Sequence, residues 1–253
     1  MSQIRSVTKT WLEDKFKDEE VRDIATKYNI STLSARVLIH HNIHKKSDED
    51  IRDFLNPTEK LLLDSDGLTL PNHFQNAVDR IKKAISSKTK IMINGDPDAD
   101  GITGTTILFV GLEALGAQPI YSFPTRTKEG HGLQPKIIDK ANHLGADLIL
   151  TVDCGSKDIK ATAYANKKGI DVIICDHHII AGEKPNAHAI INPHLIPDSK
   201  LKTLAGAGVA LKFIVDLAKA LNIDISNQIS YMTSLAALGT ISDRMSCLSP
   251  INR

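Results

Sequence analysis

The chain has 253 residues, which is enough for one large globular domain or a domain with an appendage. Its hydrophobic (42%) and charged (24%) fractions are ordinary for a globular protein. Its 31 Lys and Arg against 30 Asp and Glu give a formal net charge of +1, which excludes nucleic-acid binding driven by overall charge. Three cysteines without a Cys-x-x-Cys pair, and no apolar stretch long enough to span a bilayer, exclude a disulfide scaffold and a membrane protein, so we expect a cytoplasmic protein.

Residues 1–88 are predicted to form a helical N-terminal lead-in, because they are rich in Lys, Asp, Glu and Ile and contain almost no Gly. Apolar residues at helical spacing predict a helix after Ser31, which is a suitable N-cap. A second helix is predicted over residues 47–55, ending before Pro57 because the residue before a proline disfavours the helical conformation. A third is predicted over residues 74–85.

Residues 89–253 show a different pattern, in which short apolar runs alternate with helical stretches. Strands are predicted at residues 91–93, 120–122, 148–152, 172–175 and 189–191. Helices are predicted at residues 104–115, 135–143, 157–168, 206–221 and 227–238. This alternation predicts an α/β fold of Rossmann-like type, with a parallel sheet covered by helices on both faces. Ligands of such sheets gather at the carboxyl ends of the strands.

Three aspartates, Asp96, Asp98 and Asp100, follow the first predicted strand at alternate positions. Carboxylates this close repel one another, so keeping them ionised requires a cation or several backbone N–H donors. The spacing also resembles the start of an EF-hand calcium loop. However, the twelfth position is Ile107 in place of Glu, and a strand precedes the loop in place of a helix, which disfavours that alternative.

The helix that follows these aspartates opens with Gly101 and Thr103. A helix N-terminus presents free N–H groups and the positive end of the helix dipole, so it can receive a phosphate. Gly101 and Thr103 are therefore candidate substrate-binding residues.

Further candidates follow later strands and one helix. Asp153 comes directly after the third strand, although a turn or helix cap would explain a lone aspartate there equally well. Asp176, His177 and His178 follow the fourth strand; neutral imidazole is a good metal ligand, and a neighbouring carboxylate fixes its tautomer. Asp243 follows an apolar helix and carries little information by itself.

The combined set of oxygen and nitrogen donors suits Mn²⁺ or Mg²⁺ better than structural zinc, whose sites favour cysteine. Two such ions sharing one carboxylate could activate a water molecule and neutralise a phosphate. The candidate metal ligands are Asp98, Asp100, Asp153, His177 and Asp243.

The chain resembles the DHH phosphoesterase family through four motifs in order: GDPDADG, TVDCGS, DHH and LGTISD. It is similar to the RecJ-like branch of single-stranded-DNA-specific exonucleases through the further segments PTRTKEGHGL, INPH and LAGAG. The resemblance covers about residues 30–253. It implies Mn²⁺-favoured hydrolysis of phosphodiesters and, for the RecJ-like branch, 5′→3′ degradation of single-stranded DNA.

The resemblance also implies roles for individual residues. The five candidate ligands would hold two metal ions, with Asp153 bridging them. His178 would lie at the scissile phosphate, Asp176 would support the histidine pair, and Asp96 would line the site. Arg126 would contact a backbone phosphate. RecJ-like enzymes continue into a second domain that binds the strand, so we expect a further C-terminal domain or a separate subunit as a partner.

Three positions depart from the family pattern. Asn94 stands where many members carry a metal-binding His, Pro97 where RecJ-like proteins usually carry an aromatic, and His131 in place of a usual Tyr. Two alternatives therefore stay open: a nano-RNA or small-nucleotide phosphodiesterase of the same family, and a non-catalytic RecJ-related replication module. The complete set of motif carboxylates and histidines argues against the second.

Overall fold

The computed structural model describes residues 16–58, 60–65, 67–124 and 131–252. The chain divides into two compact units, Met1–Pro57 and Thr58–Arg253. Within the described ranges, no helix combines the length and apolar character needed to cross a membrane.

The described part of the smaller unit, residues 16–57, contains helices only. Its elements are α1 (Asp18–Tyr28), α2 (Thr32–His40), the 3-10 helix η1 (Ile43–Lys45) and α3 (Asp48–Leu55). The predicted N-cap of α2 is confirmed, because the Ser31 hydroxyl accepts the Ser34 N–H. The Ser47 hydroxyl caps α3 in the same way by accepting the Asp50 N–H. Its core is built on Leu38, Ile43, Ile51 and Phe54.

Helix α1 was not predicted as a separate helix, and two apolar residues of α2 lie on its exposed side. Leu33 is 72% exposed and Val37 is 45% exposed, whereas Ala35 and Leu38 form the buried side of α2. The periodicity therefore identified the helix without identifying its packed face.

The larger unit is built on a five-stranded, all-parallel sheet in the order β2-β1-β3-β4-β5. The strands are β1 (Lys90–Gly95), β2 (Gln118–Ser122), β3 (Ala146–Val152), β4 (Asp171–Cys175) and β5 (Ala189–Ile191). This confirms the predicted α/β fold class. From β1 the chain first moves outward to β2 and then returns to the other side of β1 to form β3. The point where the strand order reverses lies between β1 and β3, which is where ligands bind in open parallel sheets.

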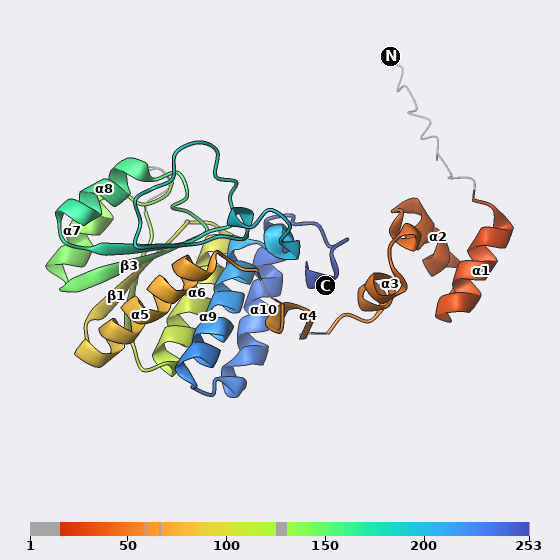
Figure 1. Ribbon diagram of the computed structural model, residues 1–253, viewed down its shortest axis with the longest axis horizontal. Helices are drawn as coiled ribbons and strands as arrows, with labels where there is room; N and C mark the ends of the chain where they lie inside the picture. The colour runs from red at the N-terminus through yellow and green to blue at the C-terminus, as the bar shows by residue number, and fades with distance from the viewer. Residues whose placement is uncertain (1–15, 59, 66, 125–130, 253) are drawn as a thin grey trace, which may run out of the picture. The chain divides into compact units, whose positions relative to one another are not determined.

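Helices cover both faces of the sheet (Figure 1). One face packs against α7 (Pro135–His143) and α8 (Ile159–Lys167). The other packs against α5 (Pro71–Ser87), α6 (Ala99–Ala114) and α9 (Gly206–Leu221), with α10 (Ser226–Ser242) lying on α6 and α9. Alternate strand residues point to opposite faces, so Ile91 and Ile93 enter the second core and Met92 the first. The remaining short elements are α4 (Lys60–Leu63), η2 (Pro193–Leu195), η3 (Lys200–Thr203) and η4 (Pro250–Asn252).

Two helix boundaries differ from the predicted ones in ways that matter for the site. Helix α6 begins at Ala99 in place of residue 104, because Asp98 caps it by accepting the Gly101 N–H. Helix α10 continues to Ser242 in place of residue 238, and Asp243 is its C-cap residue. Both shifts bring motif aspartates to helix ends at the carboxyl edge of the sheet.

Candidate metal centre

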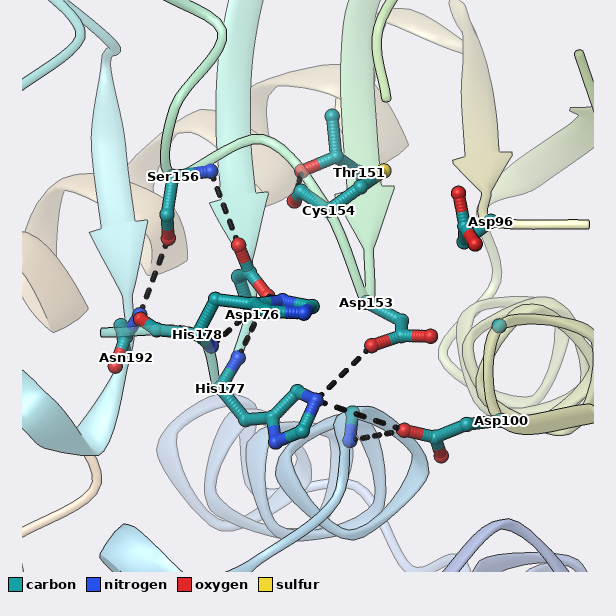
Figure 2. A network of polar contacts seen from close by, with 12 residues as sticks. Asp96, Asp100, Thr151, Asp153, Cys154, Ser156, Asp176, His177, His178 and Asn192 are labelled. Carbon is teal, nitrogen blue, oxygen red and sulfur yellow. Dashed lines mark hydrogen bonds and ion pairs between the residues drawn. The ribbon is translucent and has the colours of Figure 1, made fainter. Parts of the chain in front are cut away.

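The candidate site residues come together at the carboxyl ends of β1, β3 and β4 (Figure 2). Asp96, Asp153 and Asp176 each lie directly beyond one of these strands. Asp153 has a positive φ of 59°, a conformation that aspartate tolerates better than most residues, and its N–H donates to the Cys175 carbonyl. The structure thus brings together segments that are far apart in the sequence.

Asp100 is held by the N-terminus of a different helix. Its two carboxylate oxygens accept the Gly206 N–H at 2.7 Å and the Ala207 N–H at 2.9 Å, at the start of α9. Burial raises the pKa of Asp100, while these two hydrogen bonds and the nearby His177 lower it. The close approach requires glycine, because a Cβ on Gly206 would lie 2.7 Å from the Asp153 Cβ.

The Nε2 atom of His177 is buried and faces three carboxylates. It lies 3.1 Å from Asp153 Oδ1, 3.7 Å from Asp243 Oδ2 and 3.9 Å from Asp100 Oδ2. None of these contacts has hydrogen-bond geometry, so Nε2 has no hydrogen-bond partner among the described residues. Burial lowers the pKa of His177, but the contact with Asp153 and the charges of Asp153 and Asp100 outweigh it and raise the pKa to about 9. Burial raises the pKa of Asp153 to about 7.

Among the described residues, three groups of side chains lie close enough to hold a divalent cation. Asp153 belongs to two of them and His177 to two. The groups are Asp100 with His177 and Asp243; Asp153 with His177 and His178; and Asp96 with Asp98 and Asp153. A cation would satisfy the orphaned His177 Nε2 and the facing carboxylates together, so the donor set fits divalent metal binding.

Asp176 organises the histidine pair. It accepts the backbone N–H groups of His177 and His178, the Nδ1–H of His178 at 2.8 Å, and the Ser156 N–H at 3.0 Å. Burial alone would raise the pKa of Asp176, but the hydrogen bonds and the charge of His178 outweigh it and lower the pKa to about 2. The same hydrogen bond raises the pKa of His178. Asp176 is therefore a carboxylate that fixes the tautomer and orientation of His178.

Two further polar residues, Ser156 and Asn192, complete this network, and neither was predicted as a site residue. The Asn192 amide donates to the Ser156 hydroxyl at 3.1 Å and to the His178 carbonyl at 2.9 Å. Asn192 directly follows β5, at the same edge of the sheet as the aspartates. That position was a usable signal, because the carboxyl-end rule applies to β5 as well.

A cavity of about 230 Å³ opens beside the carboxylates, on the side of α8. Its lining includes Asp96, His131, Asp153, Lys157, Asp158, Asp176 and His178. Asp158 precedes α8 and accepts the Leu133 N–H at 2.7 Å. The cavity gives a small polar molecule access to the carboxylates.

Two of the candidate substrate-binding residues, Gly101 and Thr103, make hydrogen bonds to groups at the start of α6. The Gly101 N–H donates to Asp98, and the Thr103 hydroxyl donates to carbonyl oxygens within α6. Arg126 lies outside the described residues. Asn94, where the wider family carries His, is fully buried, and its amide lies 3.5 Å from the Cys154 sulfur.

The sequence of the larger unit matches a known family. The sequence profile of the DHH family, N-terminal domain, matches residues 90–240, and the chain belongs to this family. This confirms the resemblance that the four motifs carry.

Within the family, the chain is homologous to RecJ proteins. It is 35% identical over 234 residues to the single-stranded-DNA-specific exonuclease RecJ of Bacillus subtilis, covering 92% of this chain and 28% of the relative. It is 40% identical over 179 residues to RecJ of Salmonella typhimurium, covering 66% of this chain and 31% of the relative. The chain thus spans about a third of the length of these curated relatives.

Solved RecJ structures agree with this fold. A crystal structure of exonuclease RecJ bound to manganese superposes with a TM-score of 0.64 at 32% identity, covering 74% of this chain and 48% of that one. RecJ from Thermus thermophilus in complex with Mn²⁺ superposes with a TM-score of 0.66 at 29% identity, covering 89% of this chain and 30% of that one. The chain is therefore a DHH-family domain with a candidate metal centre, homologous to RecJ exonucleases.

Proposed function

We propose that the chain is the core of a Mn²⁺- or Mg²⁺-dependent phosphodiesterase that degrades single-stranded DNA from its 5′ end. The main support is His177 Nε2, a buried nitrogen that faces three carboxylates from separate segments and lacks a hydrogen-bond partner in the described part of the chain. Similarity to single-stranded-DNA-specific exonucleases supports the choice of substrate.

Five residues would hold two divalent cations: Asp98, Asp100, Asp153, His177 and Asp243. Asp153 would be shared, because it belongs to candidate groups on both sides. Two bound cations would supply positive charge to the scissile phosphate and make a water molecule more acidic. The N–H groups of Gly206 and Ala207 would keep the Asp100 carboxylate oriented whether or not a cation is present.

His178 would act at the scissile phosphate. Its Nδ1–H donates to Asp176, and this hydrogen bond raises the pKa of His178 and so favours the imidazolium, whose Nε2–H would give a proton to the departing oxygen. About half of the His178 side chain is exposed, and it lines the cavity, so a substrate can reach it. Asp176 would hold the ring in this orientation, and Asp96 would line the site.

Substrate binding would involve Arg126, Gly101 and Thr103, together with surfaces outside this region. A net charge of +1 gives the chain little general attraction for a polyanion, so a further domain or a separate subunit would supply much of the strand-binding surface. We propose this second component as the partner of the domain.

The test is Mn²⁺-dependent hydrolysis of single-stranded DNA labelled at either end, beside a dinucleotide, with a chelator as the control. Digestion from the 5′ end releases the 5′ label at once as a mononucleotide, while the 3′ label passes through a series of shortening strands. The reverse pattern contradicts the proposed polarity. Cleavage of the dinucleotide alone would favour the small-nucleotide alternative, and binding of Mn²⁺ without hydrolysis would favour a non-catalytic module.

A further inference from the structure

Asp96 is oriented by a residue that departs from the family pattern. The Nδ1 atom of His131 lies 3.2 Å from each of the two Asp96 carboxylate oxygens. Asp96 is largely buried, whereas the His131 side chain is 63% exposed. Among the described residues, His131 provides the one side chain within hydrogen-bond distance of the Asp96 carboxylate.

Two hydrogen bonds hold the backbone from His131 onward. Asp158 Oδ2 accepts the Leu133 N–H at 2.7 Å, and the Gln134 amide donates to the His131 carbonyl at 2.7 Å. Gly132 has a φ of +80°, and a Cβ at this position would lie 2.5 Å from Asp158 Oδ2. Leu133 is buried in the core beneath α7. His131 therefore has a defined position although its side chain is exposed.

The other carboxylates near Asp96 are oriented differently. Asp98 accepts the Gly101 N–H at its helix cap, and Asp100 accepts two N–H groups of α9. These donors are backbone groups in regular elements. Asp96 is instead oriented by the side chain of His131, which lies in a loop. Changing that side chain should therefore alter the orientation of Asp96 without disturbing the fold.

We propose that Asp96 is a further ligand beside the five already named, completing the group with Asp98 and Asp153, and that His131, positioned by Asp158, orients Asp96 and so sets the affinity of this group for a divalent cation. The inference rests on the proposed function, since it concerns one of the two cations of that site. Hydrogen bonds from outside a metal site restrict the ligand to the binding orientation, and their loss commonly weakens metal binding by about 10–100-fold. His131 would act through Asp96 and would not itself contact the cation.

The experiment is calorimetric titration of the whole chain with Mn²⁺, with electron paramagnetic resonance of bound Mn²⁺ as a second readout. His131→Phe keeps a ring of similar size and removes the donor. We expect one ion at the parent affinity and the second ion weakened by roughly 10–100-fold. The matched control is His143→Phe, the same change at an exposed histidine of α7, which should leave both affinities unchanged.

Asp158 provides a separate variant pair. Asp158→Ala removes the acceptor for the Leu133 N–H and should weaken the second ion in the same direction as His131→Phe, by a smaller factor. Asp158→Asn keeps an acceptor oxygen and should restore the parent affinity. Asp139→Ala, at an exposed carboxylate that accepts the Tyr164 hydroxyl, is its control.

The outcomes separate this inference from the proposed function. If the parent chain binds two ions and His131→Phe leaves both affinities unchanged, or tightens the second, the positioning role is wrong while the two-ion site stands. If the parent chain binds fewer than two ions, the proposed two-ion function is wrong, and the role of His131 inferred from it is wrong as well. Failure of Asp158→Asn to restore an affinity lost in Asp158→Ala contradicts the seating role of Asp158 alone.

Discussion

At the two ends of the parallel sheet, the aspartates have different charged partners. At the amino ends of β3 and β4, the buried Arg80 side chain lies 2.6 Å from Asp171 and 3.0 Å from Asp147. At the carboxyl ends, the aspartates pair with histidines: in the described residues, no Lys or Arg forms an ion pair with Asp100, Asp153 or Asp176. The amino end therefore has the permanently charged guanidinium of Arg80 beside its carboxylates, and the carboxyl end has no Lys or Arg in that position among the described residues.

This difference indicates what the carboxyl end requires. Burying carboxylates without a compensating positive charge is costly, and a protein normally avoids it by pairing or by protonation. The raised pKa values of Asp100 and Asp153 show that the carboxylates resist ionisation in the metal-free protein. A bound cation removes this penalty, so the amino end should contribute mainly to stability and the carboxyl end mainly to metal binding and turnover.

The largest effect should come from the carboxylate that two candidate groups share. Asp153→Asn keeps the shape of the side chain, and asparagine tolerates the positive φ at this position. We expect kcat for single-stranded DNA to fall by at least roughly 10³-fold, the upper end of the loss caused by removing one electrostatic group. Steady-state hydrolysis and Mn²⁺ calorimetry measure the two consequences.

Thermal unfolding of the metal-free protein is the control for this variant. Burial raises the pKa of Asp153 from an ordinary 3.8 to about 7, so ionising it costs stability increasingly as pH rises between these values. At pH 8 the metal-free Asp153→Asn protein should therefore unfold at no lower temperature than the parent. Unchanged turnover would contradict the shared-ligand role, and a clear fall in Tm would trace the lost activity to misfolding.

A smaller effect is expected at the proton donor. His178→Ala should lower kcat by roughly 10²-fold, within the range for a positioned acid or base, and leave Mn²⁺ affinity close to that of the parent. His178 also belongs to one candidate metal group, so calorimetry decides between the two roles. Equal losses of turnover and of metal affinity would reassign His178 as a ligand.

The pH dependence of Mn²⁺ binding should be no larger than the effect at His178. His177 holds a proton in the metal-free protein over most of this range, since its pKa is raised to about 9, whereas Asp153 is ionised above its own raised pKa of about 7. A metal ligand must lose its proton, so affinity should rise between pH 7 and pH 9 by up to about tenfold per pH unit. Calorimetry in two buffers with different ionisation enthalpies counts the released protons. Constant affinity without proton release over this range would contradict a protonated His177 in the metal-free protein.

Much of the fold followed from the sequence because its signals are local. The five apolar runs became the five strands, and the ends of α7 and α9 matched the predicted ranges. The rule that ligands gather at strand carboxyl ends grouped Asp96, Asp153 and Asp176 from the sequence alone. Helix α1 was not predicted, although Val21, Ile24 and Tyr28 recur there at helical spacing.

The details of the site depended on contacts that no local pattern contains. The donors that hold Asp100 come from Gly206 and Ala207, more than a hundred residues away. The contact of His131 with Asp96 depends on the loop that Asp158 seats. Asp243 carried little information by itself, because its place beside His177 depends on the full length of α10. Tertiary packing sets each of these arrangements.

The smallest effect on turnover should come from the opposite end of the sheet. Arg80→Leu removes the cation between Asp147 and Asp171, and we expect a loss of about 2 kcal/mol in unfolding free energy, since hydrogen bonds to charged groups contribute roughly 1.5–3 kcal/mol and both carboxylates are about half exposed. For a chain of this size, that loss lowers Tm by roughly 4–8 °C.

Arg80→Lys is the matched variant for this position. It keeps the charge but loses the planar fork that reaches Asp171 and the Asp147 carbonyl together, so its stability should fall between that of the parent and that of Arg80→Leu. Mn²⁺ affinity and kcat per folded molecule should stay at parent values in both variants. Arg80 lies at the amino ends of β3 and β4, whereas the candidate metal centre lies at the carboxyl ends. If turnover falls while Tm holds, the two ends of the sheet are coupled, and the division between a stabilising end and a reactive end is wrong.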